Sequence, residues 1–172
     1  MAVTINASTS SGLVQSADNS GIIEFQSNGV TKATLNSSGF SYPSAVLQVV
    51  QASYNTEFST TSNTFADIGL SASITPTSSS SKILVLYSVG YLSQDTNLGG
   101  IRLLRGSTAI QTSIRAASRD HASYFHNEYL DSPATTSSTT YKVQSNKNTG
   151  SAFLTCWNGE QPSSITLLEI AA

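Results

Sequence analysis

The chain has 172 residues, of which 38% are hydrophobic and only 10% are charged, and its formal net charge is −2. This length suits one domain of sandwich size with a short appendage, and so small a charge excludes the excess of Lys and Arg that nucleic acid binding requires. Seven Tyr and six Phe argue against intrinsic disorder, and no apolar run approaches the roughly 20 residues that span a membrane.

The abundance of Thr and Ser predicts an all-β fold, because Thr suits pleated strands, Ser suits turns, and the strong helix formers are scarce. The single cysteine, Cys156, excludes an intrachain disulfide and a cysteine-based zinc site within one chain. We expect it to be a small buried hydrophobe. The first twelve residues lack the basic start and apolar core of a signal peptide, so none is expected.

Residues 1–45 form a first region, in which a β-hairpin is predicted. Two strand-like runs, 21–26 (GIIEFQ) and 30–35 (VTKATL), flank an Asn-Gly pair that readily takes the positive φ of a tight turn. A lone hairpin is marginal in water, so this one should pack on copies of itself or on a docking surface; a flexible tail is the alternative. With a boundary near Pro43, residues 1–45 are predicted to anchor and align a knob formed by residues 46–172.

From residue 46 the chain alternates strand-like runs with turn residues. In residues 64–75 apolar side chains alternate with small polar ones, which is typical of a half-buried antiparallel strand. Further strands are expected at residues 46–52, 81–92, 101–105, 108–112, 124–130, 141–144, 152–157 and 165–170. Eight or nine strands with no credible helix predict an antiparallel β-sandwich of jelly-roll type.

Residues 81–92, SKILVLYSVGYL, predict the central strand of the domain. An outer strand buries one face and alternates, so consecutive apolar residues indicate a strand covered on both faces. A single buried helix is the alternative, which the β-branched residues and Gly90 disfavour. The last strand also carries apolar residues on both faces, so we expect a surface for self-association. The candidates for the interface between copies are Leu84, Leu86, Tyr87, Leu168, Ile170, Arg102 and Arg105.

A few polar side chains are candidates for ligand contact: Tyr124, His126, Glu128, Asp95 and Asn97. The first three would share one face of a strand, which suits contact with a ligand or a metal ion on a threefold axis. An ordinary surface or interface histidine is the alternative for His121 and His126. The chain has no nucleophile elbow, no His-Glu-x-x-His and no phosphate-binding glycine loop, so we predict no catalytic residue, no dedicated metal site and no cofactor.

The four arginines fall within one short stretch, as Arg102, Arg105, Arg115 and Arg119. They could lie on a solvated face, paired with Asp95, Asp120 or Glu128. They could instead bridge subunits or contact an acidic surface, because a guanidinium group binds a carboxylate in two-pronged fashion.

Several strings, SNTFADIGLSASITPTSSSSKILVLYSVGYL, IRLLRGSTAI, EYLDSP followed by TTYKV, and SSITLLEI, resemble small fibre-like and structural virion proteins of tailed bacteriophages, of the cyanophage and marine phage type. The resemblance covers residues 46–170, and residues 19–40 look like the hairpin module that often precedes such domains. It implies a homotrimeric head of the tumour-necrosis-factor or C1q jelly-roll shape, located on the virion surface. The family offers no catalytic residues to carry over.

The first hypothesis is therefore a non-enzymatic trimeric structural protein of a phage particle, either a short fibre on the tail or baseplate or a fibre or decoration protein on the head. Residues 1–45 would contact other virion proteins. The second is a module that binds host-surface glycan through loops such as residues 94–99 and 118–123. The third is an enzyme such as a glycan depolymerase, which should keep paired carboxylates in a groove.

Overall fold

The computed structural model describes residues 20–37, 39–93, 99–114, 122–147, 154–156 and 162–171. Every helix or strand in these residues is a β-strand, so the predicted all-β fold class is confirmed. The chain forms two compact units, Met1–Pro43 and Ser44–Ala172. Within the described residues there is no helix that is both long and apolar enough to cross a membrane.

The N-terminal unit contains a three-stranded antiparallel sheet in the order β1-β2-β3, formed by β1 (Ile23–Ser27), β2 (Val30–Asn36) and β3 (Gly39–Ser41). The predicted hairpin is present, and its turn residues Asn28 and Gly29 have φ angles of 52° and 72°. Both angles lie in the left-handed region that a two-residue hairpin turn requires. The third strand was not predicted.

The second unit, which we call the knob, contains ten strands among its described residues. They are β4 (Val46–Tyr54), β5 (Phe58–Thr60), β6 (Ala66–Ile74), β7 (Lys82–Ser93), β8 (Gly99–Arg105), β9 (Thr108–Ile114), β10 (Ala122–Asp131), β11 (Thr139–Lys147), β12 (Leu154–Cys156) and β13 (Ser163–Ile170).

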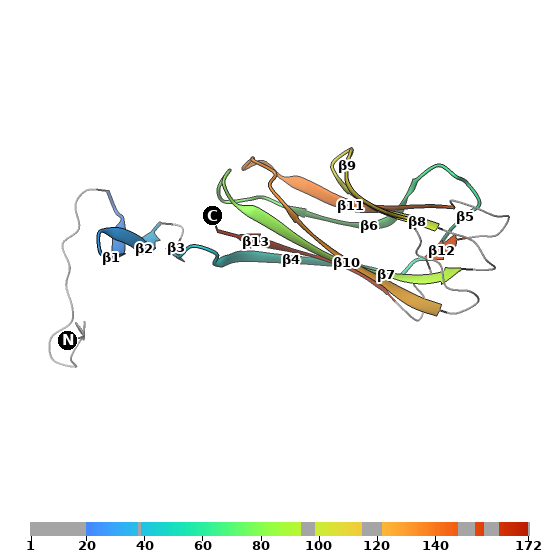
Figure 1. Ribbon diagram of the computed structural model, residues 1–172, viewed down its shortest axis with the longest axis horizontal. Coiled ribbons are helices and arrows are strands. Elements are labelled where there is room, and N and C mark those ends of the chain that lie inside the picture. Colours follow the sequence, from blue (N-terminus) through green and yellow to red (C-terminus); the bar gives the residue numbers. More distant parts are fainter. Residues whose placement is uncertain are drawn as a thin grey trace. The chain divides into compact units, whose positions relative to one another are not determined.

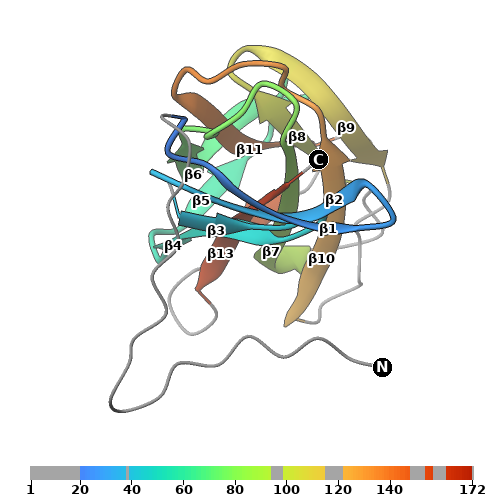
Figure 2. The same cartoon turned by 90° about the vertical axis from the view of Figure 1, so that its left-hand side faces the viewer.

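These strands form two antiparallel sheets that stack as a jelly-roll-like sandwich (Figure 1). In the first sheet, β7 pairs with β10 along one edge. Along its other edge, β7 pairs first with β13 and then with β12. Beyond these two strands, β4 pairs with β13 and β5 pairs with β12. The second sheet has the order β6-β11-β8-β9. Figure 2 shows the two sheets of the knob on opposite sides of the core.

The core lies between the sheets and is built by residues at alternate strand positions, as period-2 strands require. Its buried side chains are Ile68, Leu70, Ala72, Ile74, Ile83, Val85, Tyr87, Val89, Ile101, Leu103, Tyr141, Val143, Ile165 and Leu167. The alternation predicted within residues 64–75 is confirmed, because every apolar residue of β6 from Ile68 to Ile74 is buried.

A buried carboxylate links the two sheets at the end of β10. Both oxygens of Asp131 accept hydrogen bonds from Arg105 Nη1, each at 2.9 Å, and Asp131 Oδ2 accepts a third from Tyr141 Oη at 2.6 Å. Burial and the neighbouring carboxylate raise the pKa of the Tyr141 hydroxyl, so it stays protonated and donates. The group therefore ties β8 and β11 of the second sheet to β10 of the first.

A second buried carboxylate, Glu169, lies at the end of β13. Its Oε1 accepts hydrogen bonds from the backbone N–H and the hydroxyl of Thr77, at 2.7 and 2.8 Å, and its Oε2 accepts one from Gln48 Nε2 at 2.6 Å. Burial raises the pKa of this carboxyl, but the donors around it outweigh burial and hold the pKa below its ordinary value. Glu169 is therefore ionised at neutral pH, and it fixes the β6–β7 loop against β13 and β4.

Candidate functional site on the outer face of the knob

The first sheet has an outer face, which we define as the side of β4, β13, β7 and β10 that points away from the second sheet. Along β7, Ile83 and Val85 are fully buried, whereas Leu84 is half-buried and Leu86 is 37% exposed. Along β13, Leu168 and Ile170 are half-buried in the same way. The central strand is thus covered completely on one face only within a single copy of the chain.

Four large apolar side chains form a continuous row across this face. Val49 pairs with Leu168, Leu168 with Leu84, and Leu84 with Leu130. Directly opposite residues of neighbouring strands share a face and lie in contact range. Val49 and Leu130 are 59% and 52% exposed. We call this set, Val49, Leu168, Leu84 and Leu130, the apolar row.

The next two rows of the outer face become increasingly polar. Thr166 pairs with Leu86, which pairs with Glu128. One step further, Ser164 pairs with Ser88, which pairs with His126. The outer face therefore changes from aliphatic side chains to hydroxyl, imidazole and carboxylate groups along the same strands.

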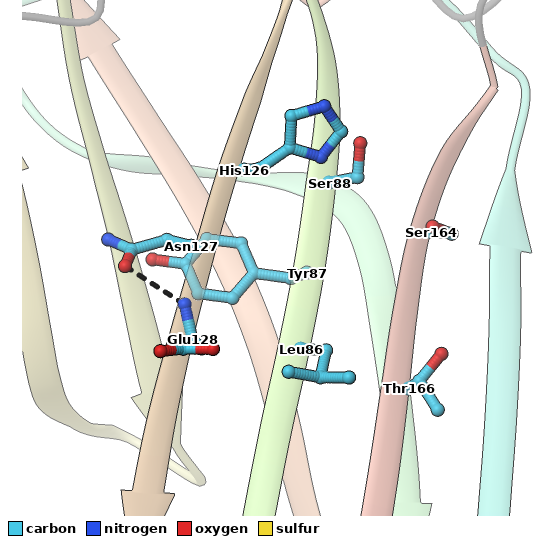
Figure 3. Close-up of a pocket in the computed structure, with 8 residues that line it drawn as sticks. All are labelled: Leu86, Tyr87, Ser88, His126, Asn127, Glu128, Ser164 and Thr166. Carbon is cyan, nitrogen blue, oxygen red and sulfur yellow. Dashed lines mark hydrogen bonds between the residues drawn. The ribbon is translucent and has the colours of Figure 1, made fainter.

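An open groove with a volume of about 450 Å³ follows these polar rows (Figure 3). Its walls come from three neighbouring strands, and its lining residues are Leu86, Tyr87, Ser88, His126, Asn127, Glu128, Ser164 and Thr166. The Asn127 side-chain oxygen accepts a hydrogen bond of 2.9 Å from the backbone N–H of Glu128.

An aromatic platform continues the groove along β10. The rings of Tyr124 and His126 stack with centroids 5.4 Å apart and an interplanar angle of 26°, and Tyr124 is 42% exposed. Such a platform, together with hydroxyl groups and one carboxylate, can contact a neutral polar ligand by stacking and hydrogen bonds. In the part of the chain that the structure describes, no group of three or more His, Cys, Asp or Glu side chains could hold a metal ion.

The candidates for ligand contact fall into two groups. Tyr124, His126 and Glu128 share the outer face of β10, as their spacing predicted. Of these three, His126 and Glu128 line the groove. Asp95 and Asn97 lie outside the described residues, as do His121, Arg115 and Arg119.

The candidates for the interface between copies are divided among different surfaces. Leu84, Leu86, Leu168 and Ile170 lie together on the outer face. Tyr87 does not share this face, because its side chain is buried in the core, where its hydroxyl donates to Gln111 at 3.0 Å and burial raises its pKa to about 12.

The two arginine candidates form their contacts within the chain. Arg105 binds Asp131, as described above. Arg102 lies over the Phe65 ring, 4.2 Å from its centroid, and donates from Nε to Gln144 at 2.8 Å. The carboxylate partner of Arg105 is therefore not one of the three that the sequence suggested.

Two members of the apolar row, Leu130 and Val49, were not predicted. Leu130 follows Tyr124, His126 and Glu128 at the same period of two, so the alternation of β10 contained a signal for it. Val49 had no such signal, since only the pairing of β4 with β13 places it beside Leu168.

Comparison with known proteins gives structural neighbours only, since no protein family model and no curated protein matches this chain. One neighbour is a chain of the T13 particle of infectious bursal disease virus, at 13% identity with a TM-score of 0.44 over 87% of this chain. A second neighbour comes from the Gx strain of the same virus, at 12% identity with a TM-score of 0.42 over 87% of this chain. A third comes from the VP2 subviral particle of this virus, at 16% identity with a TM-score of 0.38 over 73% of this chain. This chain spans about two fifths of each, respectively 40%, 43% and 38%.

Proposed function

We propose that this chain is a non-enzymatic structural protein of a virion surface, and more specifically a bacteriophage short fibre or decoration protein whose copies associate as a homotrimer. The observation that carries the proposal is the apolar row of the outer face. Four large side chains lie in register across four strands and two of them are more than half exposed, which supports the proposal that another chain covers this surface. A copy of the same chain is the cover that this proposal assigns.

Two further features support this assignment. Only 10% of the residues are charged, which suits a surface protein that neither binds nucleic acid nor relies on long-range electrostatic attraction. The sequence strings that resemble tailed-phage virion proteins include most of β7 and β13, the strands that carry the centre of the apolar row. In this proposal residues 46–172 form the exposed knob, and residues 1–45 contact other virion proteins.

Placing a carboxylate in the apolar row should dissociate the assembly. We expect Leu84→Glu to reduce the mass measured by light scattering to that of one chain, and to remove the protein from purified particles, because a buried unpaired charge costs several kcal/mol. Ser71→Glu is the matched control, since Ser71 is exposed on β6 of the other sheet. Wild-type assembly of Leu84→Glu would contradict the proposed interface, provided that its thermal unfolding shows a folded knob.

The groove supports a second candidate function, recognition of a host-surface glycan. The observation that favours it is the stacked Tyr124 and His126 pair beside the Glu128 carboxylate and the hydroxyl groups of the groove. Neutral sugars offer apolar ring faces and hydroxyl groups that match such a lining.

This second function predicts a defined pattern of loss. On an array of neutral and N-acetylated oligosaccharides, we expect Tyr124→Ala and Glu128→Gln each to lower the affinity for any sugar that binds by about tenfold. A loss of this size corresponds to one charge-assisted hydrogen bond or one stacking contact. Ser71→Glu again serves as the control. Binding that both variants retain would place the sugar elsewhere, and an array without any binding would remove this function.

A further inference from the structure

The groove of the outer face contains one carboxylate and neither lysine nor arginine. Among its lining residues only Glu128 is acidic, and its side chain is exposed. The two ion pairs found among the described residues belong to other carboxylates, those of Asp131 and Asp67. The groove therefore presents a carboxylate whose counter-charge a ligand can supply.

The described cations of the knob lie away from this carboxylate. Glu128 pairs with Leu86, and Lys82 precedes Leu86 by four residues, which is about 13 Å along β7. Glu128 is also six residues, or about 20 Å, from Ala122 at the start of β10. The remaining described cations of the knob belong to β8 and β11 of the second sheet and are Arg102, Arg105, Lys142 and Lys147.

The backbone that carries Glu128 is fixed to the second sheet. Its N–H donates to the Asn127 side-chain oxygen at 2.9 Å, and its carbonyl accepts a hydrogen bond of 3.0 Å from Gln111 Nε2. The Asn127 amide donates in turn to Ser113 Oγ at 3.1 Å. Gln111 and Ser113 both belong to β9, so these bonds hold the middle of β10 in place from the opposite sheet. A binding group on a fixed strand loses little conformational freedom when a ligand arrives.

An aromatic ring lies on the same side of β10 as the carboxylate. Tyr124 and Glu128 are four residues apart, so both point to the outer face, with His126 between them. The two are separated by about 13 Å along the strand, so one charged group of a ligand cannot contact both. A ligand longer than one sugar unit could place a ring on Tyr124 and a cationic group at Glu128.

Hydroxyl groups on the two neighbouring strands face the same groove. Ser88 lies on β7 beside His126, and Ser164 and Thr166 follow on β13 (Figure 3). Each hydroxyl can both donate and accept a hydrogen bond. A lysine side chain of a protein partner would use only the carboxylate, whereas the hydroxyl groups of a sugar would also pair with these serine and threonine side chains. The lining therefore favours a cationic group that belongs to a sugar.

We propose that the groove binds amino sugars with a free ammonium group more tightly than their N-acetylated counterparts. This inference rests on the glycan recognition proposed above and adds the chemical class of the sugar. N-acetylation removes the positive charge that would pair with Glu128 and replaces it with a bulkier neutral amide. One solvent-exposed, charge-assisted contact corresponds to a preference of about tenfold.

The test is an array on which each amino sugar is displayed in two forms, with its free amine and N-acetylated, and is probed with the full chain at neutral pH and low salt. We expect the free amine to bind about tenfold more tightly in at least one pair, and the preference to decrease as salt is added. Glu128→Gln should remove the preference. Asp67→Asn is the matched control, because it removes a carboxylate that is 51% exposed on the other sheet, and it should leave the preference unchanged.

The outcomes separate this inference from the function on which it rests. Sugar binding without a preference for the free amine would overturn the inference and leave glycan recognition in place, whereas an array without any binding would remove both. A preference that Glu128→Gln retains would place the ammonium group elsewhere and overturn the inference. An equal loss of preference in Asp67→Asn would also overturn it, because the preference would then reflect the overall acidity of the chain.

A further variant and a competitor test whether the ammonium group belongs to a sugar. Ser164→Ala should lower the affinity for both forms of a pair by the same factor, because the hydroxyl group contacts the part that the two forms share. Lysine amide should compete poorly with the free amino sugar. Competition by lysine amide as strong as that by the amino sugar would overturn the assignment to sugars in favour of a lysine-bearing protein partner.

Discussion

Replacing Asp131 with alanine is expected to destabilise the knob by about 3 kcal/mol. The Asp131 side chain is only 7% exposed and accepts three hydrogen bonds from Arg105 and Tyr141, which belong to the opposite sheet. Its removal leaves the fully buried Tyr141 hydroxyl without an acceptor and Arg105 without its counter-charge. For a domain of this size, the loss should lower the melting temperature measured by calorimetry by about 10 °C.

Asp67→Ala is the matched control for this prediction. Asp67 also pairs with a cation, Lys142 Nζ at 2.8 Å, but its side chain is 51% exposed. The hydrogen bond from Lys142 is the largest cause that holds the pKa of Asp67 below its ordinary value. Water screens such a pair, so we expect a loss of no more than about 1 kcal/mol. If Asp131→Ala and Asp67→Ala lowered the free energy of unfolding equally, the buried link between the sheets would contribute no more to stability than an ordinary surface ion pair.

Gly69→Ala is expected to destabilise the knob by about 3 kcal/mol, for two separate reasons. Gly69 has a φ of 92° at a break in the register between β6 and β11, a conformation that L-residues rarely adopt. In addition, a Cβ atom at this position would overlap the ring of Tyr54, which lies directly against the glycine. Denaturant unfolding of purified variants gives the free energy for comparison.

Gly106→Ala separates the two reasons. Gly106 lies in the β8–β9 turn with a φ of 59°, and a Cβ atom there would meet no atom within 4 Å. This variant carries the backbone cost alone, about 1 kcal/mol. The double variant Gly69→Ala, Tyr54→Ala should be less destabilised than the sum of its single changes, because the overlap is removed. A loss from Gly69→Ala no larger than that from Gly106→Ala would refute the role of Tyr54.

Most of the fold could be predicted from the sequence, because hydrophobic alternation and turn residues are local signals. The hairpin around Asn28-Gly29 and the alternating strand β6 were found in this way. The three-residue strands β3 and β5 were not, because such short strands contain too few residues to show a period of two. Their pairing depends on neighbours, since β5 pairs only with the equally short β12 among the described strands.

The site could be predicted only in part, because register is a property of the folded sheet. The shared face of Tyr124, His126 and Glu128 follows from local spacing. Which residues of β7 point outward does not, since an uninterrupted apolar run gives no alternation, and Tyr87 was grouped with Leu84 for that reason. Arg102 and Arg105 were grouped by closeness in sequence, although one contacts Phe65 and the other contacts Asp131.

The order of the rows along β7 and β13 has a consequence for any assembly that uses the outer face. Leu84 and Leu168 lie toward one end of these strands, while Ser88 and Ser164 lie toward the other. Copies that pack together at the aliphatic end of these strands would separate toward the hydroxyl-bearing end, so the distance between neighbouring protomers would increase along the strands. His126, which lies at the hydroxyl-bearing end, would then remain accessible to solvent between neighbouring protomers in the assembled protein.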